Sequence, residues 1–315
     1  MTNYQVEILP GPLLSLGEGP HWDIASQSLY YVCLLSGSLH RYAFKDNRTY
    51  SANIPGITHV SFIIPVKGKS EEFVIGSRTR LILVKWDGLS TSASELRTLC
   101  ALGEADAQQQ FNDGKVNPQG QLYAGTMLSD SAANPSGMGT GKLYRFDAGS
   151  DGSEGGTLSE LINGVHISNG LTWCKATNKF YYIDSFAFDI KEYDTDGRGN
   201  LSDNGRVLIK IKSDEAATEF MADGMTSDVD GNLYVALFAG SKVLKINPIT
   251  ATVEQEIQLP VAQLTSVAFG GPNLDLLFVT SAAKELTGPQ AENAGAVFKI
   301  TGLGVKGKPM NEIEL

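Results

Sequence analysis

The sequence contains few cysteines and few cationic residues for its length. Only three of its 315 residues are cysteine, Cys33, Cys100 and Cys174, an odd number without close spacing. A disulfide framework is therefore not expected, and reduced thiols are the simplest interpretation. Lysine and arginine number 25 against 35 acidic residues, which gives a formal charge of −10. Because no basic stripe is visible, nucleic acid is not an expected partner.

Long apolar segments are also missing. No apolar run reaches membrane-spanning length, and residues 1–10 lack the basic and apolar parts of a secretory signal. We therefore expect no membrane partner and a cytoplasmic location. Without Lys/Arg clusters or a large visible apolar patch, a monomer is the default expectation. No long segment has an apolar face at helical period, whereas short apolar runs bounded by Gly, Asp, Asn or Pro indicate strands and an all-β fold.

A short sequence motif recurs along this strand-rich chain. It consists of a small polar pair ending in Gly, an apolar run, a tight turn and an aromatic strand. The clearest copies begin at Phe111, Ser168 and Ala222, and fainter copies begin at Gly17, Val60 and Thr265. These six copies stand roughly 40 to 57 residues apart, a spacing typical of propeller blades or other arrays. The predicted units are 14–56, 57–100, 101–150, 160–212, 218–258 and 262–302.

No linker divides the repeats, so one domain over residues 1–315 is predicted. Most units are expected to close on a strand of alternating pattern, such as Lys142 to Phe146. Residues 5–8 belong to no unit, and we predict that they pair with the last unit and close a ring. Residues 148–157 and 129–140 are predicted to be loops, the second at the rim of a pocket.

The repeat places polar side chains in one shared position. In a propeller the start of each innermost strand faces a central channel, so Glu18, Asn112, Asn169 and Asp223 should converge. The oxygen ligands Glu18, Asn169 and Asp223 suit a hard divalent cation, Ca²⁺ first and Mg²⁺ or Mn²⁺ next. The alternative is that the Asn-Gly and Asp-Gly pairs are only turn chemistry. His21 is expected either to line the channel or to pack on its neighbour in sequence.

Such an arrangement would leave coordination positions open for water and substrate. An open metal site can polarise an ester or lactone carbonyl, while a carboxylate takes a proton from the attacking water.

At these residues the chain resembles the regucalcin family, also called senescence marker protein or gluconolactonase-like proteins. The motifs that carry the resemblance run in order along nearly the whole chain: 17–22, 111–116, 123–127, 167–171, 181–185 and 223–225. The stretches 60–65, 268–273 and 301–307 are most similar to an insect branch that includes luciferin-regenerating enzyme.

The resemblance implies a six-bladed β-propeller with one divalent cation on its axis (calcium, zinc, manganese or magnesium) and hydrolysis of sugar lactones. Glu18, Asn169 and Asp223 match the family's metal ligands, and Asp223 also matches its proposed general base. Asn112 matches a residue that contacts substrate near the metal.

Three positions depart from the family's pattern. Gln110 stands where the family usually has a substrate-binding Arg, and Gln lacks the charged, five-donor fork of Arg. Asp130 stands where vertebrate members place a substrate-contacting Glu. Cys33 replaces a common Asp and is expected to be either a small buried residue or a reactive thiol. Gln110 and Asp130 would therefore tune specificity.

The leading hypothesis is a metal-dependent hydrolase of sugar lactones or related small lactones and esters. One alternative is a calcium-binding regulatory or buffering protein without significant catalysis. Another is an enzyme of the luciferin-regenerating type, acting on a specialised nitrile, thioester or organophosphate ligand.

Overall fold

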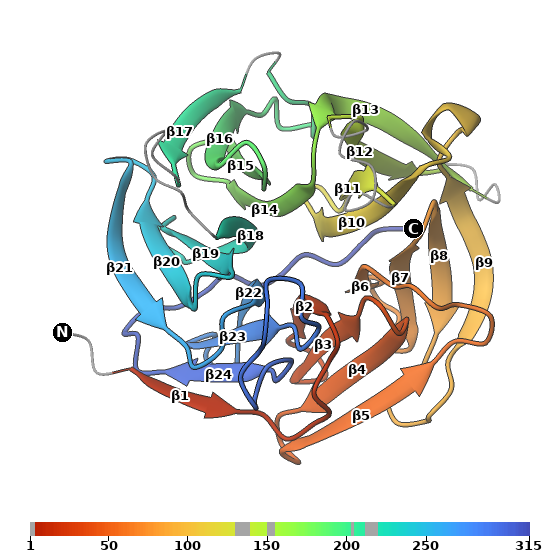
Figure 1. Ribbon diagram of the computed structural model, residues 1–315. Helices are drawn as coiled ribbons and strands as arrows, with labels where there is room; N and C mark the ends of the chain where they lie inside the picture. The colour runs from red at the N-terminus through yellow and green to blue at the C-terminus, as the bar shows by residue number, and fades with distance from the viewer. Residues whose placement is uncertain (1–3, 130–138, 150–154, 203–204, 212–219) are drawn as a thin grey trace.

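Six four-stranded antiparallel sheets surround a central axis like the blades of a propeller (Figure 1). The computed structural model describes residues 4–129, 139–149, 155–202, 205–211 and 220–315. Its architecture confirms the predicted all-β, six-bladed propeller. In five of the blades the strand nearest the axis comes first in the sequence, and the chain then zigzags outward.

Five blades consist of four consecutive strands each. The first has β2 (Gly17–Asp23), β3 (Ser28–Cys33), β4 (Ser38–Ala43) and β5 (Arg48–Asn53). The second has β6 (Phe62–Pro65), β7 (Glu72–Ser77), β8 (Arg80–Lys85) and β9 (Ser94–Ala101). The third has β10 (Gln109–Val116), β11 (Leu122–Leu128), β12 (Gly141–Ala148) and β13 (Gly156–Val165). The fourth has β14 (Ser168–Cys174), β15 (Lys179–Asp184), β16 (Asp189–Asp194) and β17 (Arg206–Lys210). The fifth has β18 (Met221–Ser227), β19 (Leu233–Phe238), β20 (Lys242–Asn247) and β21 (Thr252–Gln258).

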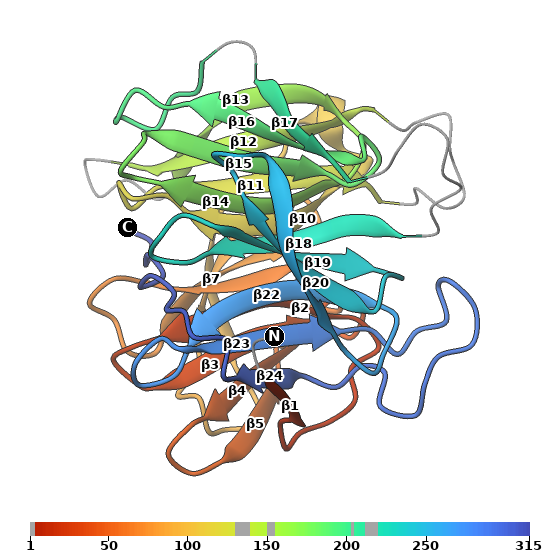
Figure 2. The ribbon, with the colours of Figure 1, turned by 90° about the vertical axis from the view of Figure 1, so that its left-hand side faces the viewer.

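The sixth blade joins the two ends of the chain. Its strands are β22 (Leu264–Gly270), β23 (Leu276–Ser281), β24 (Phe298–Thr301) and, outermost, β1 (Gln5–Ile8). β1 runs antiparallel to β24, with Gln5 opposite Thr301 and Ile8 opposite Phe298 (Figure 2). The predicted ring closure by residues 5–8 is therefore confirmed.

The predicted unit boundaries need one correction. The alternating strands expected to close the units, such as β4, β8 and β12, are third strands, and an outer fourth strand follows each of these. β13 shows the consequence most clearly, because it belongs to the third blade although residues 160–165 were assigned to the fourth unit. It also begins at Gly156, inside the segment predicted to be a loop. These outer strands are largely solvent-facing, so their apolar pattern is weak.

The hydrophobic core is divided into six layers, one between each pair of neighbouring blades. Within these layers, aromatic side chains from neighbouring blades pack against each other. Tyr30 of the first blade lies 4.8 Å from Phe73 of the second between ring centroids, and Tyr234 of the fifth lies 4.9 Å from Phe269 of the sixth. Offset and edge-on contacts of this kind add about 0.5–1.5 kcal/mol each beyond burial. Each blade is thus held by both neighbours, which fixes the inner strands around the axis.

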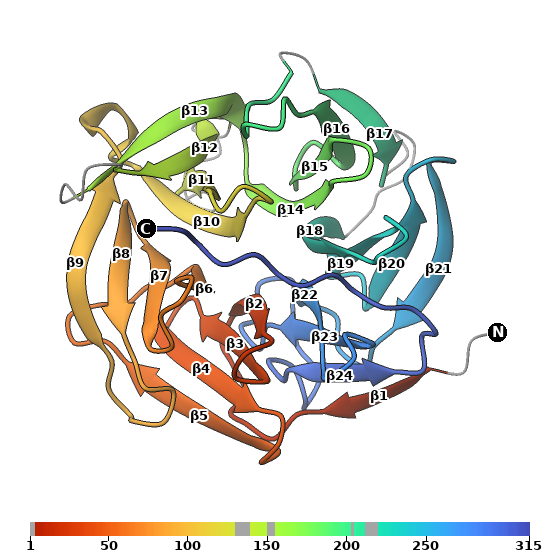
Figure 3. The same cartoon turned by 180° about the vertical axis from the view of Figure 1, so that it is seen from behind.

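The segment after β24 crosses one end of the ring (Figure 3). Its backbone is hydrogen-bonded to several blades, through Val229 N to Lys306 O (2.9 Å), Lys67 N to Ile313 O (2.9 Å) and Glu314 N to Gly120 O (3.1 Å). We call residues 303–315 the C-terminal tail. Among the described residues the helix content is a short 3₁₀ turn, η1 (Glu104–Asp106), and no helix is long and apolar enough to span a bilayer.

Candidate functional site

The polar residues that the repeat singles out lie near the first end of four inner strands. Glu18 is in β2, Asn112 in β10, Asn169 in β14 and Asp223 in β18. At each of these positions the pairing with the second strand shifts register. A bulge bends the strand and redirects a side chain, and here it recurs at the same level of four blades. The Asn-Gly and Asp-Gly pairs are therefore strand bulges, so the alternative that they are only turn chemistry is wrong.

The glycines at these bulges allow neighbouring inner strands to approach closely. A Cβ on Gly170 would lie 2.7 Å from the Asp223 carbonyl oxygen, and one on Gly224 would lie 2.1 Å from Ser266 Oγ. Neither distance is tolerated in a packed interior. Gly is required here because the strands converge on the axis, which explains the recurrence of the pair in the sequence.

A chain of hydrogen bonds links three of the blades at this level. Asn112 Nδ2 donates to the Ser168 carbonyl (2.9 Å) and, more weakly, to Asn169 Oδ1 (3.4 Å). Asn169 Nδ2 donates to Ser185 Oγ (2.8 Å), and this hydroxyl donates to the Ala222 carbonyl (2.7 Å). With its amide nitrogen held by Ser185, Asn169 keeps its oxygen on the opposite side, next to Asn112. The structure thus brings Asn112 and Asn169 together and adds Ser185 as their support.

Carboxylates gather at the same end of the axis. Burial raises the pKa of Glu18 well above its ordinary value, and the negative charges of Asp223 and Asp113 add to this effect. Burial, with Asp113 as a second cause, also raises the pKa of Asp223. Glu18 keeps some solvent contact, while Asp223 is only 8 % exposed. Glu18 and Asp223 lie within electrostatic range of each other and of a third carboxylate, Asp113, that the sequence had not singled out.

The acidic cluster fits a cation. Several buried carboxylates that repel one another are costly unless a positive charge neutralises them. Glu18, Asn169 and Asp223 offer hard oxygen donors, the type that Ca²⁺ and Mg²⁺ prefer. Within the described ranges, no group of three or more His, Cys, Asp or Glu side chains is arranged to hold a metal ion. The predicted ligands Glu18, Asn169 and Asp223 are not a group of this kind, because Asn169 offers an amide oxygen.

His21 lines a small cavity together with Asp113, Lys115 and Ser266, which agrees with the first of its two expected placements. Its Nε2 has no hydrogen-bond partner among the described residues, and burial lowers its pKa to about 4. Lys115 Nζ donates to the Met225 carbonyl (2.5 Å). His21 therefore stays neutral at physiological pH.

Gln110 is buried and lies at the start of β10, the strand that also carries Asn112 and Asp113. Its Oε1 accepts a hydrogen bond from Arg78 Nη1 (3.3 Å), and the Arg78 carbonyl accepts the Phe111 N–H (2.8 Å). Arg78 is an exposed residue of the β7–β8 turn in the left-handed backbone region, at φ 52°. The Arg78 guanidinium, which comes from the neighbouring blade, therefore lies next to Gln110, the position where the family usually has an Arg. No motif in the sequence indicated Arg78. Asp130 lies outside the described residues.

Cys33 is a small buried residue of the core. It packs with Trp22 and Tyr31, is 3 % exposed, and its Sγ lies 3.1 Å from Ser15 Oγ. Burial raises its pKa, but hydrogen bonds from Ser15, Ser36 and nearby backbone outweigh burial, so that the net shift is downward. All three cysteines are free, in agreement with the absence of a disulfide framework.

The fold and the residues at its axis define a six-bladed β-propeller with an acidic and amide-lined site at one end. The family model for the SMP-30/gluconolactonase/LRE-like region matches residues 16–283, and the chain belongs to this family.

Its relatives share the whole length of the chain. Regucalcin of Danio rerio is 33 % identical over 315 residues, covering 98 % of each chain. Among solved structures, a luciferin-regenerating enzyme superposes with a TM-score of 0.88 at 34 % identity, covering 99 % of this chain and 100 % of that one. A calcium-binding regucalcin of Agrobacterium tumefaciens gives a TM-score of 0.81 at 22 % identity, covering 99 % and 98 %, which shows the same fold.

Proposed function

We propose that this protein is a divalent-cation-dependent hydrolase of lactones or related small esters, with Ca²⁺ the first candidate and Zn²⁺, Mn²⁺ or Mg²⁺ as alternatives. The observation that carries the proposal is the meeting of Glu18, Asp223 and the Ser185-held Asn169 at one end of the axis. Family membership supports it, since the family model itself includes gluconolactonases.

In this proposal Glu18, Asn169 and Asp223 hold the cation. A bound divalent cation would supply electrophilic polarisation of the substrate carbonyl and stabilise developing negative charge. Asp223 takes a proton from the attacking water, a role that suits a buried carboxylate whose pKa burial raises. Asn112, fixed by Ser168, orients the substrate beside Asn169.

The substrate's polar groups would meet Gln110 and Arg78. Arg78 uses one donor on Gln110, and no other hydrogen bond from its guanidinium to the described residues is present. Its remaining donors are thus available for hydroxyl or carboxyl oxygens of a substrate. Asp130 is proposed as a further specificity residue. The protein is further proposed to act as a cytoplasmic monomer without a nucleic-acid or membrane partner.

The test is hydrolysis of D-glucono-δ-lactone and of smaller and aromatic lactones by chelator-stripped protein, with each metal restored in turn. We expect metal-restored turnover that Asp223→Asn lowers by at least about a thousandfold. Asp189→Asn is the matched control, because Asp189 is buried to a similar degree but lies in β16, away from the inner strands.

Two results would contradict the proposal. Full metal-dependent turnover by the Asp223 variant would exclude its proposed role. Saturable Ca²⁺ binding without turnover of any lactone would favour a calcium-binding regulatory protein, or an enzyme of the luciferin-regenerating type acting on a substrate outside this class.

A further inference from the structure

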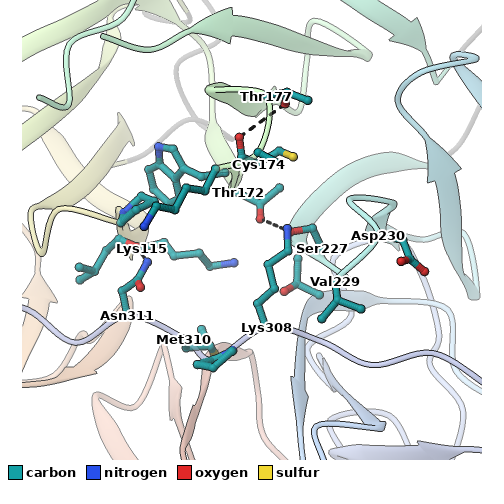
Figure 4. A pocket seen from close by; sticks show the side chains of 17 residues that line it. Lys115, Thr172, Cys174, Thr177, Ser227, Val229, Asp230, Lys308, Met310 and Asn311 are labelled. Atoms are coloured by element: carbon teal, nitrogen blue, oxygen red, sulfur yellow. Dashed lines mark hydrogen bonds between the residues drawn. The ribbon is translucent and has the colours of Figure 1, made fainter. Parts of the chain in front are cut away.

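A second cavity lies at the other end of the propeller axis. It has a volume of about 480 Å³ and is lined by the final residues of inner strands β10, β14 and β18. Glu18, Asn169 and Asp223 lie near the first ends of their strands, whereas this cavity is lined by residues toward the last ends of inner strands. The C-terminal tail forms one wall of the cavity through residues 308–311 (Figure 4).

The charge of this cavity is opposite to that of the protein as a whole. Its lining contains three lysines, Lys115, Lys175 and Lys308, and a single carboxylate, that of Asp230. Lys175 and Lys308 form no ion pair with any residue in the described part of the chain. In a chain with a formal charge of −10, this local excess of positive charge favours an anion.

The remaining walls are apolar, with a small hydroxyl patch. Val116, Trp173 and Met310 contribute apolar surface, and the Thr172 and Ser227 hydroxyls lie 2.9 Å apart and hydrogen-bond to each other. Figure 4 shows Lys115 and Lys308 extending into the space between Thr172 and Met310. Small-molecule sites have volumes of roughly 300–1,000 Å³ and combine apolar walls with a few polar groups that fix orientation.

We infer that this cavity is a second ligand site, for a small organic carboxylate with an apolar or aromatic body. The carboxylate lies against the ammonium group of Lys308, and the apolar body lies against Trp173 and Met310. Lys115 Nζ is already hydrogen-bonded to the Met225 carbonyl. The residues that line this cavity do not include Glu18, Asn169 or Asp223, so a ligand here does not contact the proposed cation ligands. The inference is independent of the proposed hydrolase activity.

The experiment is calorimetric titration of the full-length protein with 2-naphthoate and with its uncharged isostere 2-naphthamide. We expect saturable binding of naphthoate and at least about tenfold weaker binding of naphthamide, because a hydrogen-bonded charge is lost. Lys308→Ala should weaken naphthoate binding by about tenfold or more, and Lys308→Glu should weaken it further. Lys306→Ala is the matched control, since Lys306 is an exposed lysine of the same tail that does not line the cavity.

Thermal unfolding of each variant establishes that it is folded before titration. Absence of saturable naphthoate binding would overturn the inference. So would equal binding of naphthoate and naphthamide, or equal losses in the Lys308 and Lys306 variants. Because the readout is heat of binding, a protein without lactonase activity still gives a decisive result.

Discussion

Replacing Ser185 with alanine tests whether the hydrogen-bond chain behind Asn169 prepares the cation site. The Ser185 hydroxyl is 3 % exposed, accepts from Asn169 Nδ2 at 2.8 Å and donates to the Ala222 carbonyl at 2.7 Å. Its removal leaves a buried donor and a buried acceptor without partners. Each such group costs about 1–3 kcal/mol, so we expect the free energy of unfolding to fall by about 2–6 kcal/mol.

The same change should also weaken cation binding. Without Ser185 the Asn169 amide can rotate and present its nitrogen in place of its oxygen. Loss of a group that orients a ligand typically lowers metal affinity by about 10- to 100-fold, equal to about 1.4–2.7 kcal/mol. Calorimetric titration of chelator-stripped protein with Ca²⁺ measures this loss, and denaturant unfolding measures the change in stability.

Ser281→Ala is the control for this prediction. Ser281 is equally buried and similarly bonded, since its Oγ accepts from Gly295 N (3.0 Å) and donates to the Ala296 carbonyl (2.6 Å). Its loss should lower stability by a similar amount and leave Ca²⁺ affinity unchanged. Equal Ca²⁺ affinity in the Ser185 and Ser281 variants would refute the assignment of Ser185 as a positioning residue.

Three further predictions concern the substrate end and the titrating groups. Arg78→Ala should raise the KM for a lactone by about tenfold with little change in kcat. The control Arg80→Ala removes an exposed ion pair and should alter neither KM nor kcat. Equal kinetics of the two variants would contradict the proposed role of Arg78. Burial raises the pKa of Glu18 and Asp223 above their ordinary 4.5 and 3.8, so the folded cation-free protein holds protons on these groups that the unfolded chain releases. Their contribution to the free energy of unfolding should therefore fall as pH rises above about 4.5, and the difference in stability between the wild type and Asp223→Asn across this range measures it. Added Ca²⁺ should stabilise the wild type more at higher pH, and an increment independent of pH would argue against these ligands. Burial lowers the pKa of His40 from 6.5 to about 4. Up to about 3 kcal/mol of the free energy of unfolding should therefore be lost as pH falls from 6.5 to about 4. His40→Gln should make the free energy of unfolding, measured with denaturant, depend less on pH in this range.

The propeller could be predicted because its inner strands carry an unusual signal. Polar side chains at the bulges of β2, β10, β14 and β18 interrupt apolar strands at the same place in each repeat, and glycines follow them because neighbouring backbones approach closely. The outer strands could not be placed from the sequence, because a solvent-facing edge strand such as β17 is largely exposed and carries little apolar pattern. This is why β13 was assigned to the wrong repeat.

Two residues near the site, Arg78 and Asp113, could not be predicted from the sequence. Arg78 belongs to a turn, where exposed arginines are common, and its nearness to Gln110 depends on how two blades pack. Asp113 was hidden by its own motif, since it follows Asn112 and its convergence with Glu18 and Asp223 depends on strand direction at the bulge. Long-range packing decides both, and a single sequence does not encode it locally.

The pairing of β1 with β24 has a consequence for the order of events during synthesis. Residues 5–8 leave the ribosome long before their partners at 298–301. Five blades can fold as local zigzags while translation continues, but in the sixth the outer strand β1 has no partner until β22, β23 and β24 have emerged. Until then the nascent ring carries unpaired strand edges, the feature that favours aggregation of slowly folding β proteins. Removing residues 5–8 and removing residues 298–301 should therefore damage the same sheet, although the two segments are far apart in the sequence.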